Sequence, residues 1–449
     1  MFGLGCSISS ARADAESVNT SSTKGSYVTT ARGRKRVAVL ASTAVLALGL
    51  AACGGSGGES SGSSSSGGVT TMTWQMWSGS EIETEALNHL SEMVTQANPD
   101  IKLTIQTSTF PDYWTKLAAQ ASGGDVGCIL GVQGPRAPSI SSLMLPLDQG
   151  KLDAAGIKMS EFNSSISQAL QSDGQQIAVP YDFGPLVVFY NKDLFDKAGV
   201  KAPTTTWTVD EFEAAARKLT TDGKNGYGFF PTVDQFAAWT LTRTGQQPID
   251  ASGKLQIDTP EMTSTFEWLQ GLAKDGVIPQ LPATTDTNAA LNEYIAGNTA
   301  MVVDGPWQYG NIVKTAKFKP GVAVIPAGAA GGTSHIAGSG YGVSKSCKTP
   351  DAALKAIATI TGPEAEKYLG ETGRAYPART AQSDAWYVGD LAEAKPALTA
   401  ANAKSEPFHS SATLSQVQSV FQQYGIPAMN GQQGAADFLK QVQQQAGGQ

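Results

Sequence analysis

Residues 177–200, IAVPYDFGPLVVFYNKDLFDKAGV, lie in the central part of this 449-residue chain. On their N-terminal side, segments with strand-like alternation and segments with helical periodicity follow one another from residue 71 onward. Strands are expected at 71–77, 101–105 and 125–132, and helices at 81–97 and 113–121. This alternation predicts an α/β fold with a mostly parallel sheet whose faces are covered by helices.

Two capping signals mark helix starts. Ser80 and Glu83 form an S-x-x-E box before the first helix, and Asn98-Pro99 ends that helix. Thr208 and Glu211 form a second box, directly after Trp207. We interpret Trp207 as a hydrophobic staple for the helix that follows, and therefore as a structural residue.

Three blocks resemble those of a known family, in the same order along the chain. They are PY…YNKDLF-x-x-AGV at 180–200 with TWTVDEF at 206–212, AMVVDGPW at 300–307, and GSGYGVS at 338–344 followed by GRAYP at 373–377. Together they resemble the extracellular solute-binding proteins of family 1, the carbohydrate receptors of ABC importers. The similarity extends over residues 71–449.

This resemblance implies a type II periplasmic-binding-protein-like fold, with two α/β lobes joined by three interlobe crossovers. Lobe 1 would hold residues 69–182 and 341–378, and lobe 2 residues 186–335 and 382–449. The ligand would bind in the cleft between the lobes, which a hinge closes around it. Ligand sites at the carboxyl ends of open α/β sheets agree with this placement.

Two of the four cysteines lie in the part of the chain that is expected to fold. Cys6 and Cys53 lie in or at the end of the N-terminal segment, so Cys128 and Cys347 remain. In an oxidising compartment two cysteines suggest one disulfide, with a buried pair of free thiols as the alternative. The resemblance implies that the strand at 341–347 returns antiparallel beside the third strand, which predicts a Cys128–Cys347 bond.

A segment typical of a secretory signal comes before the folded part. Basic residues at 32 and 34–36 are followed by an apolar run of about 14 residues, too short for a membrane-spanning helix of about 20. The ending Leu-Ala-Ala-Cys resembles a bacterial lipobox, which implies cleavage before Cys53 and lipidation of its thiol. The alternative is an ordinary signal with an incidental cysteine.

The predicted signal peptide is residues 1–52, and its first 31 residues suggest an over-extended gene model. Residues 53–68 would be the lipidated cysteine and a Gly/Ser linker that behaves as a random coil. No later segment is long and apolar enough to span a bilayer. We therefore expect an extracytoplasmic domain that is held at the cell membrane only by its lipid. We also expect it to be a monomer. The acidic balance, with a net charge of −7 and no basic runs in the mature part, argues against nucleic acid or anionic lipid as partners.

A sugar site needs aromatic platforms together with planar amide, carboxylate or guanidinium partners. Several residues of these types lie where strands or turns should reach the cleft, and the family uses an aromatic at the position of Trp307 as a platform. Each has a structural alternative: core packing for the aromatic residues, and a solvated loop or an interlobe salt bridge for Trp77 and Arg136. The predicted ligand-binding residues are Trp77, Gln133, Arg136, Tyr181, Asp182, Trp239, Trp307, Tyr341 and Arg374.

Patterns typical of enzymes are weak. The one G-x-S-x-G match, at 58–62, lies in the linker without a strand-turn-helix context, and the three histidines are far apart. No cofactor or metal site is expected. We therefore predict a sugar or oligosaccharide receptor that delivers its ligand to ABC permease subunits, and not an enzyme. The alternatives are a glycoside-active enzyme with paired carboxylates, and the same fold with a phosphorylated polyol or peptide ligand.

Overall fold

The computed structural model describes residues 68–221 and 223–447, which form one compact unit. The predicted signal peptide, Cys53 and nearly all of the linker lie outside these residues. Within them, no helix combines the length and apolar character that crossing a bilayer requires.

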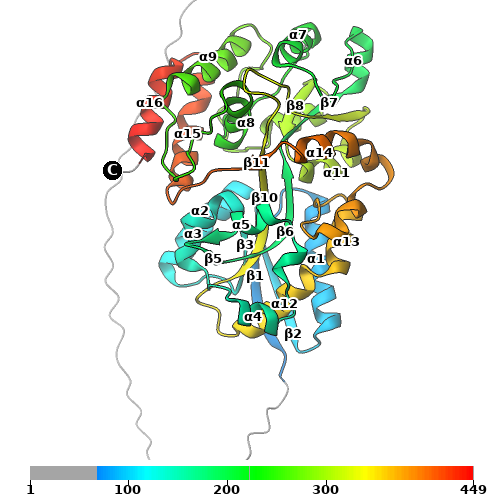
Figure 1. The fold of residues 1–449 in the computed structure, drawn as a ribbon, viewed down its shortest axis with the longest axis vertical. Helices are drawn as coiled ribbons and strands as arrows, with labels where there is room; N and C mark the ends of the chain where they lie inside the picture. The colour runs from blue at the N-terminus through cyan, green and yellow to red at the C-terminus, as the bar shows by residue number, and fades with distance from the viewer. Residues whose placement is uncertain (1–67, 222, 448–449) are drawn as a thin grey trace, which may run out of the picture. The chain divides into compact units, whose positions relative to one another are not determined.

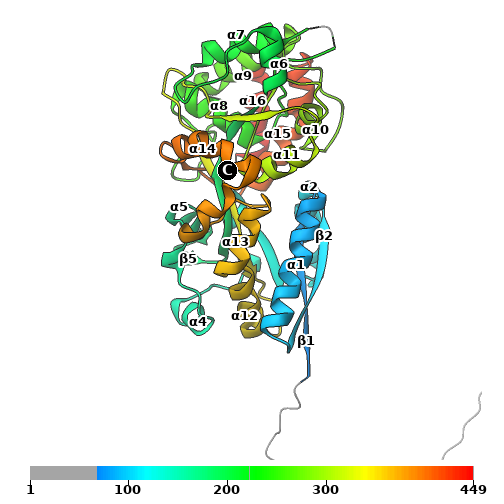
Figure 2. The same ribbon diagram turned by 90° about the vertical axis from the view of Figure 1, so that its right-hand side faces the viewer.

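The larger sheet is built around three parallel strands, as predicted. β1 (Thr70–Trp77) pairs with β2 (Ile101–Ser108) and β3 (Ile129–Gln133). α1 (Glu81–Ala97) and α2 (Phe110–Gly123) connect them, and α1 packs against α12 (Pro350–Ile360) and α13 (Pro363–Glu371), as Figure 2 shows. The third strand is shorter than predicted and begins four residues later, at Ile129.

A smaller second sheet has the order β8-β7-β9. β7 (Val187–Asn191) pairs antiparallel with both β8 (Met301–Asp304) and β9 (Pro320–Ala323), so the expected parallel arrangement does not extend to this part of the chain. The helices around it include α6 (Lys192–Ala198), α7 (Val209–Leu219), α8 (Val233–Thr244), α9 (Pro260–Lys274), α10 (Ala289–Ile295), α11 (Tyr309–Thr315), α15 (Leu414–Met429) and α16 (Ala435–Ala446). The two sheets lie in separate lobes (Figure 1).

Three extended segments lie side by side, and two of them, β10 and β6, are strands of the larger sheet. β10 (His335–Val343) pairs antiparallel with β3 on one edge and with β6 (Val179–Pro185) on the other. β6 in turn is bonded to the segment around Pro377, through an Asp182–Pro377 bridge and the Ala378 N–H, which donates to the Tyr181 carbonyl. This arrangement agrees with the predicted fold of two α/β lobes joined by crossovers.

Alternate glycines allow β10 to lie close to β6. A Cβ at Gly338 would stand 2.5 Å from the Asp182 carbonyl oxygen, and one at Gly340 would stand 2.5 Å from that of Val179. Both distances are shorter than a carbon and an oxygen can approach without moving the backbone. The Gly-Ser-Gly-Tyr-Gly pattern at 338–342 therefore follows from the close packing of these strands.

Both helix caps form, one of them in an altered way. At α7 the Thr208 hydroxyl accepts from the Glu211 N–H and the Glu211 carboxylate accepts from the Thr208 N–H, while Trp207 packs against Phe212 at 5.7 Å between ring centroids. The prediction for Trp207 is thereby confirmed. At α1 the Ser80 hydroxyl accepts from the Glu83 N–H, but the Glu83 carboxylate accepts from the Gly79 N–H.

A disulfide connects the start of β3 to the turn after β10. Cys128 and Cys347 are bonded, with their Cα atoms 4.4 Å apart and a separation of 219 positions in sequence. The antiparallel register brings Ile129 opposite Val343, which places the two cysteines at the same end of the strand pair. The bond therefore closes a very long loop.

Removing this bond should lower the stability of the protein without changing its fold. Intact-mass analysis under denaturing, non-reducing conditions should find Cys128 and Cys347 oxidised, and the double variant Cys128→Ser/Cys347→Ser should lose roughly 2–5 kcal/mol of unfolding free energy, because the unfolded chain regains the entropy of a long loop. Two free thiols in the folded wild type would contradict the pairing.

The packing of β10 gives a second prediction. Gly340→Ala should cost roughly 1–3 kcal/mol of unfolding free energy, because the new methyl group meets backbone that cannot move aside. Gly271→Ala in α9 is the matched control, since no atom lies within 4 Å of a Cβ at that position. The control should be neutral or stabilising, because alanine is the better helix former. Equal melting temperatures for the two variants would disprove the argument.

Candidate functional site

A cavity of about 1340 Å³ lies between the two lobes. The first lobe contributes the ends of β1 and β3, the start of α2, and parts of β6 and β10. The second contributes the starts of α8 and α15 and the turn after β8. The cavity is larger than the roughly 300–1,000 Å³ of sites for drug-sized ligands, so it offers room for an extended ligand.

The structure brings seven of the nine predicted site residues together around this cavity. They come from segments as far apart in sequence as β1 and the region after α13. The seven are Trp77, Gln133, Arg136, Tyr181, Asp182, Trp307 and Arg374.

The other two, Trp239 and Tyr341, do not line the cavity. Trp239 is fully buried in α8, where its indole N–H donates to the Tyr227 hydroxyl at 2.8 Å and its ring packs against Phe212. Tyr341 is 1% exposed, because its side chain points to the sheet face where it stacks on Tyr181 at 4.4 Å. Both are core residues, which corrects the expectation that they contact a ligand.

One wall of the cavity is aromatic. Trp77 packs edge-on against Phe110 and Tyr113, each at 5.3 Å between centroids, and lies tilted on Trp114 at 5.6 Å. Phe110 and Trp114 also line the cavity, although the sequence did not single them out. The helix predicted at 113–121 includes Trp114, but α2 begins three residues earlier, at Phe110. No local pattern shows which residues at the start of a helix turn toward a distant lobe.

Arg136 connects this wall to the opposite lobe. Its guanidinium lies 4.6 Å from the centroid of Trp114, and it donates to the Ser415 hydroxyl at 3.0 Å and to the Gln418 amide oxygen. Gln418 in turn donates to Asp234 at 3.2 Å. Burial lowers the pKa of Arg136 to about 10, an effect that the nearby Asp234 carboxylate partly offsets.

A second network of charged residues also lines the cavity. The Arg374 guanidinium pairs with Glu83 at 3.3 Å and donates to the Tyr181 hydroxyl at 3.4 Å. Burial alone would lower the pKa of Arg374, but Glu83 and its other acidic neighbours raise it above its ordinary value. Burial raises the pKa of Asp182 to about 7, although Arg374 and hydrogen bonds from Ser339 act in the opposite direction.

Trp307 lines the cavity on the second lobe. It is half-buried, and a Cβ on Gly305 would overlap its ring, so only glycine lets the indole lie in this position. Asp304 accepts from the Gly305 N–H at 2.7 Å and is hydrogen-bonded by the Trp307 side chain. Burial nevertheless raises the pKa of Asp304 to about 7.

Several buried polar atoms around the cavity have no hydrogen-bond partner within the described protein. A buried polar atom left unpaired costs roughly 1–3 kcal/mol, so such atoms are usually satisfied by a ligand or by water. The atoms are Trp114 Nε1, Gln133 Oε1, Arg136 Nε, Asp182 Oδ1 and Asp234 Oδ1.

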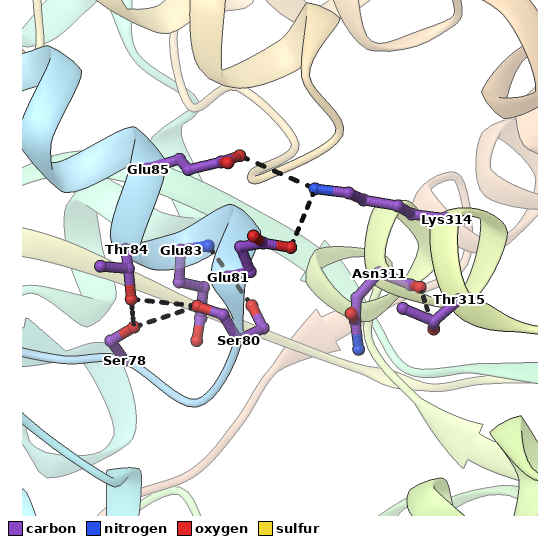
Figure 3. A network of polar contacts seen from close by, with 9 residues as sticks. All are labelled: Ser78, Ser80, Glu81, Glu83, Thr84, Glu85, Asn311, Lys314 and Thr315. Atoms are coloured by element: carbon purple, nitrogen blue, oxygen red, sulfur yellow. Dashed lines mark hydrogen bonds and ion pairs between the residues drawn. The ribbon is translucent and has the colours of Figure 1, made fainter.

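The rim carries a contact between the lobes. Figure 3 shows Lys314 of α11 reaching toward the start of α1, where its ammonium lies 3.4 Å from the Glu81 carboxylate and 3.7 Å from that of Glu85. All three side chains are exposed, so the pairs contribute at most about 1 kcal/mol. Residues 68–221 and 223–447 contain no group of three His, Cys, Asp or Glu side chains that could hold a metal ion.

The raised pKa of Asp182 predicts a pH dependence of stability. Its carboxyl group binds a proton more tightly in the folded protein, near pH 7, than in the unfolded chain, near 3.8. The contribution of this group to the unfolding free energy should therefore fall as the pH rises from about 4 to about 7, by at most about 4 kcal/mol.

In the Asp182→Asn variant, the melting temperature should change less between pH 5 and pH 8 than it does in the wild type. Asp258→Asn, at an exposed position outside the cavity, should keep the wild-type slope. The interpretation fails if Asp182→Asn and the wild type show the same dependence.

Comparison with known proteins identifies the family. The sequence profile of the bacterial extracellular solute-binding proteins matches residues 90–400. The sn-glycerol-3-phosphate-binding periplasmic protein UgpB of Agrobacterium fabrum is 29% identical over 163 residues, which make up 34% of this chain and 36% of that protein. The chain thus aligns with about a third of the length of this curated relative.

Solved structures agree with the fold. The ABC substrate-binding protein Lmo0181 of Listeria monocytogenes, in complex with cycloalternan, has a TM-score of 0.77 at 24% identity, covering 84% of this chain and 97% of that one. Maltose-bound MalE3 of T. maritima has a TM-score of 0.73 at 22% identity, covering 83% and 98%. With a family profile over most of its length and the two-lobed fold of these proteins, the chain belongs to the bacterial extracellular solute-binding proteins.

Proposed function

We propose that this protein is a membrane-anchored receptor of an ABC importer that binds a sugar or oligosaccharide in the interlobe cavity and delivers it to the permease. The observation that carries the proposal is the combination of aromatic faces and unpaired polar atoms around one cavity of about 1340 Å³. No covalent chemistry is needed. Affinity would come from stacking, hydrogen bonds and the free energy of closure.

A carbohydrate has apolar C–H faces and polar hydroxyl groups, and the residues around this cavity offer binding partners for both. The C–H faces of a pyranose ring stack on aromatic side chains, and Trp77, Trp114 and Trp307 offer such groups on opposite lobes. The hydroxyls of the sugar form hydrogen bonds with planar amide and carboxylate groups, which Gln133 and Asp182 supply. The structures of related fold include proteins described with bound cycloalternan and maltose, which supports a carbohydrate ligand here.

The domain boundaries belong to the same proposal. Lobe 1 would comprise residues 69–182 and 341–378, and lobe 2 residues 186–335 and 382–449. The division is supported by the two separate sheets and by the passage of β6 and β10 between them. The hinge would then lie where these strands cross between the lobes, and its bending would open and close the cavity.

The location and partners rest on the N-terminal sequence and on the family. The basic, apolar and Leu-Ala-Ala-Cys segments support secretion and lipidation of Cys53. A Gly/Ser-rich segment of about 15 residues, taken as a random coil, would have a root-mean-square reach of roughly 20 Å, enough for a tethered monomer to meet permease subunits in the same membrane.

A thermal-shift screen with mono- and oligosaccharides, polyols, amino acids and peptides tests the proposal. A ligand that binds only the folded state raises its stability, by about 2.7 kcal/mol at 100 times its dissociation constant. We expect one class of sugar to raise the melting temperature, without any turnover of that sugar. Trp307→Ala should abolish most of the shift, because it removes a platform from the cavity.

Trp268→Ala is the matched control. Trp268 is also a half-buried tryptophan of the second lobe, but it does not line the cavity. This variant should melt at a lower temperature and still show the full ligand-induced shift. A shift from peptides or amino acids alone, or hydrolysis of the sugar, would overturn the proposed function.

A further inference from the structure

One arginine joins the two lobes inside the cleft. Arg136 ends the turn at Gly134–Arg136, directly after β3 of the first lobe. Its Nη1 atom donates to the Ser415 hydroxyl at 3.0 Å and its Nη2 atom donates to the Gln418 amide oxygen, and both partners belong to α15 of the second lobe. Gln418 also donates to Asp234 of α8 at 3.2 Å. The guanidinium is thus connected to two helices of the opposite lobe.

Uncharged hydrogen bonds surround this arginine. The Ser139 hydroxyl donates to the Arg136 carbonyl at 2.8 Å and lies 3.3 Å from the Ser415 hydroxyl. The Ser410 hydroxyl, just before α15, donates to the Pro135 carbonyl. The lobes are therefore held together here by several hydrogen bonds, all of them between groups of the protein.

These contacts require the lobes to be close together. Arg136 follows β3, whereas its partners are carried by α15, so a rotation about β6 and β10 would separate donor from acceptors. Arg136 is only 7% exposed, and opening would replace its protein partners by water. Hydrogen bonds from a charged donor are roughly twice as strong as neutral ones. We therefore expect them to affect closure more than the exposed Lys314 pairs at the rim do.

Arg136 also contacts the aromatic wall of the cavity. Its guanidinium lies 4.6 Å from the ring centroid of Trp114 and 5.9 Å from that of Phe110. Trp114 in turn packs edge-on against Phe110 at 5.7 Å and Tyr113 at 4.9 Å. A cation over the face of an indole ring attracts it and so restricts its position. The residue that joins the lobes thus also fixes part of the wall.

We propose that Arg136 is an interlobe latch: its contacts with Ser415 and Gln418 stabilise the closed cleft and hold Trp114 in the aromatic wall. Arg136 then acts on affinity as a positioning residue and not by contacting the ligand, which favours the interlobe alternative for this residue. The inference uses the closure that the proposed function assumes, but it does not depend on which sugar binds.

A latch has a distinctive effect on binding. The apparent affinity of a protein is proportional to the fraction that is in the binding-competent form. Weakening the latch should therefore lower the affinity for every ligand by the same factor. Removing a side chain that contacts the ligand should instead affect different ligands unequally.

Two variants test the contact from its two sides. Arg136→Met and Gln418→Met replace each side chain by an unbranched apolar one and remove the hydrogen bond. Small-angle X-ray scattering without added sugar should give a larger radius of gyration for both variants than for the wild type. In melting experiments the double variant should lose less than the sum of the two single losses, because both changes remove the same contact. If Arg136→Met does not fold, Gln418→Met and Ser415→Ala provide the test from α15.

Titration calorimetry tests the effect on affinity. Maltose and maltotriose are the first probes, followed by every other sugar that binds in the thermal-shift screen. We expect Arg136→Met to weaken the binding of each sugar by a common factor of about ten, which corresponds to about 1.4 kcal/mol.

Arg243→Met is the matched control. The Arg243 guanidinium also lies over a tryptophan, Trp268, at 4.7 Å. These two residues belong to α8 and α9 of the second lobe, and neither lines the cavity. This variant should melt at a lower temperature and keep the wild-type radius of gyration and the wild-type affinities.

The outcomes separate the latch from the proposed function. The scattering and melting experiments need no sugar, so an unchanged radius of gyration together with additive losses would disprove the latch whatever the ligand is. Binding that weakens for one sugar and not for another would assign Arg136 to ligand contact and overturn the inference as well. If the latch holds and no carbohydrate of the wider screen binds, the proposed function fails and the latch stands.

Discussion

The rest of the structure depends on the pairing of one strand, β10, with β3 on one edge and β6 on the other. All nine of its residues are buried. Its glycines let the backbone of β6 come so close that no side chain fits between them. Since β10 and β6 both pass between the lobes, this close pair fixes where the two sheets stand and therefore where the cavity opens.

Around that pair, polar groups are held in place by other polar groups. Arg374 is fixed by Glu83 and Tyr181, and Tyr181 is fixed by its stacking on Tyr341. Burying a charge lowers the stability of the folded state unless the charge is paired. These contacts therefore let charged residues line a cleft open to water without destabilising the fold. Asp182, whose Oδ1 atom is buried without a hydrogen-bond partner among the described residues, belongs to the residues that line the cavity.

The contacts between the lobes differ in strength. Arg136 is buried and bonded to two side chains of α15, whereas the Lys314 pairs at the rim are exposed to solvent. An opening motion would have to break the Arg136 contacts and rehydrate the guanidinium, while the rim pairs would be exchanged for water at little cost. The balance between open and closed forms is therefore expected to depend on the interior of the cleft more than on its edge.

By itself, the sequence determined the local features of the protein. The first two strands, both flanking helices and the staple of Trp207 on α7 follow from periodicity and capping, because these depend on residues close together in the chain. The prediction of two lobes, and of most of the residues around the cavity, came from the resemblance over three blocks and not from periodicity.

Tertiary structure decided which aromatic and charged residues face the cavity and which are core. Trp239 and Tyr341 are aromatic like Trp77 and Trp307, yet they pack against Tyr227 and Tyr181 of other elements and do not line the cavity. Phe110 and Trp114 reach the cavity only because α2 begins opposite the second lobe. The partners that bury or expose such side chains are distant in sequence, so no local pattern encodes the outcome.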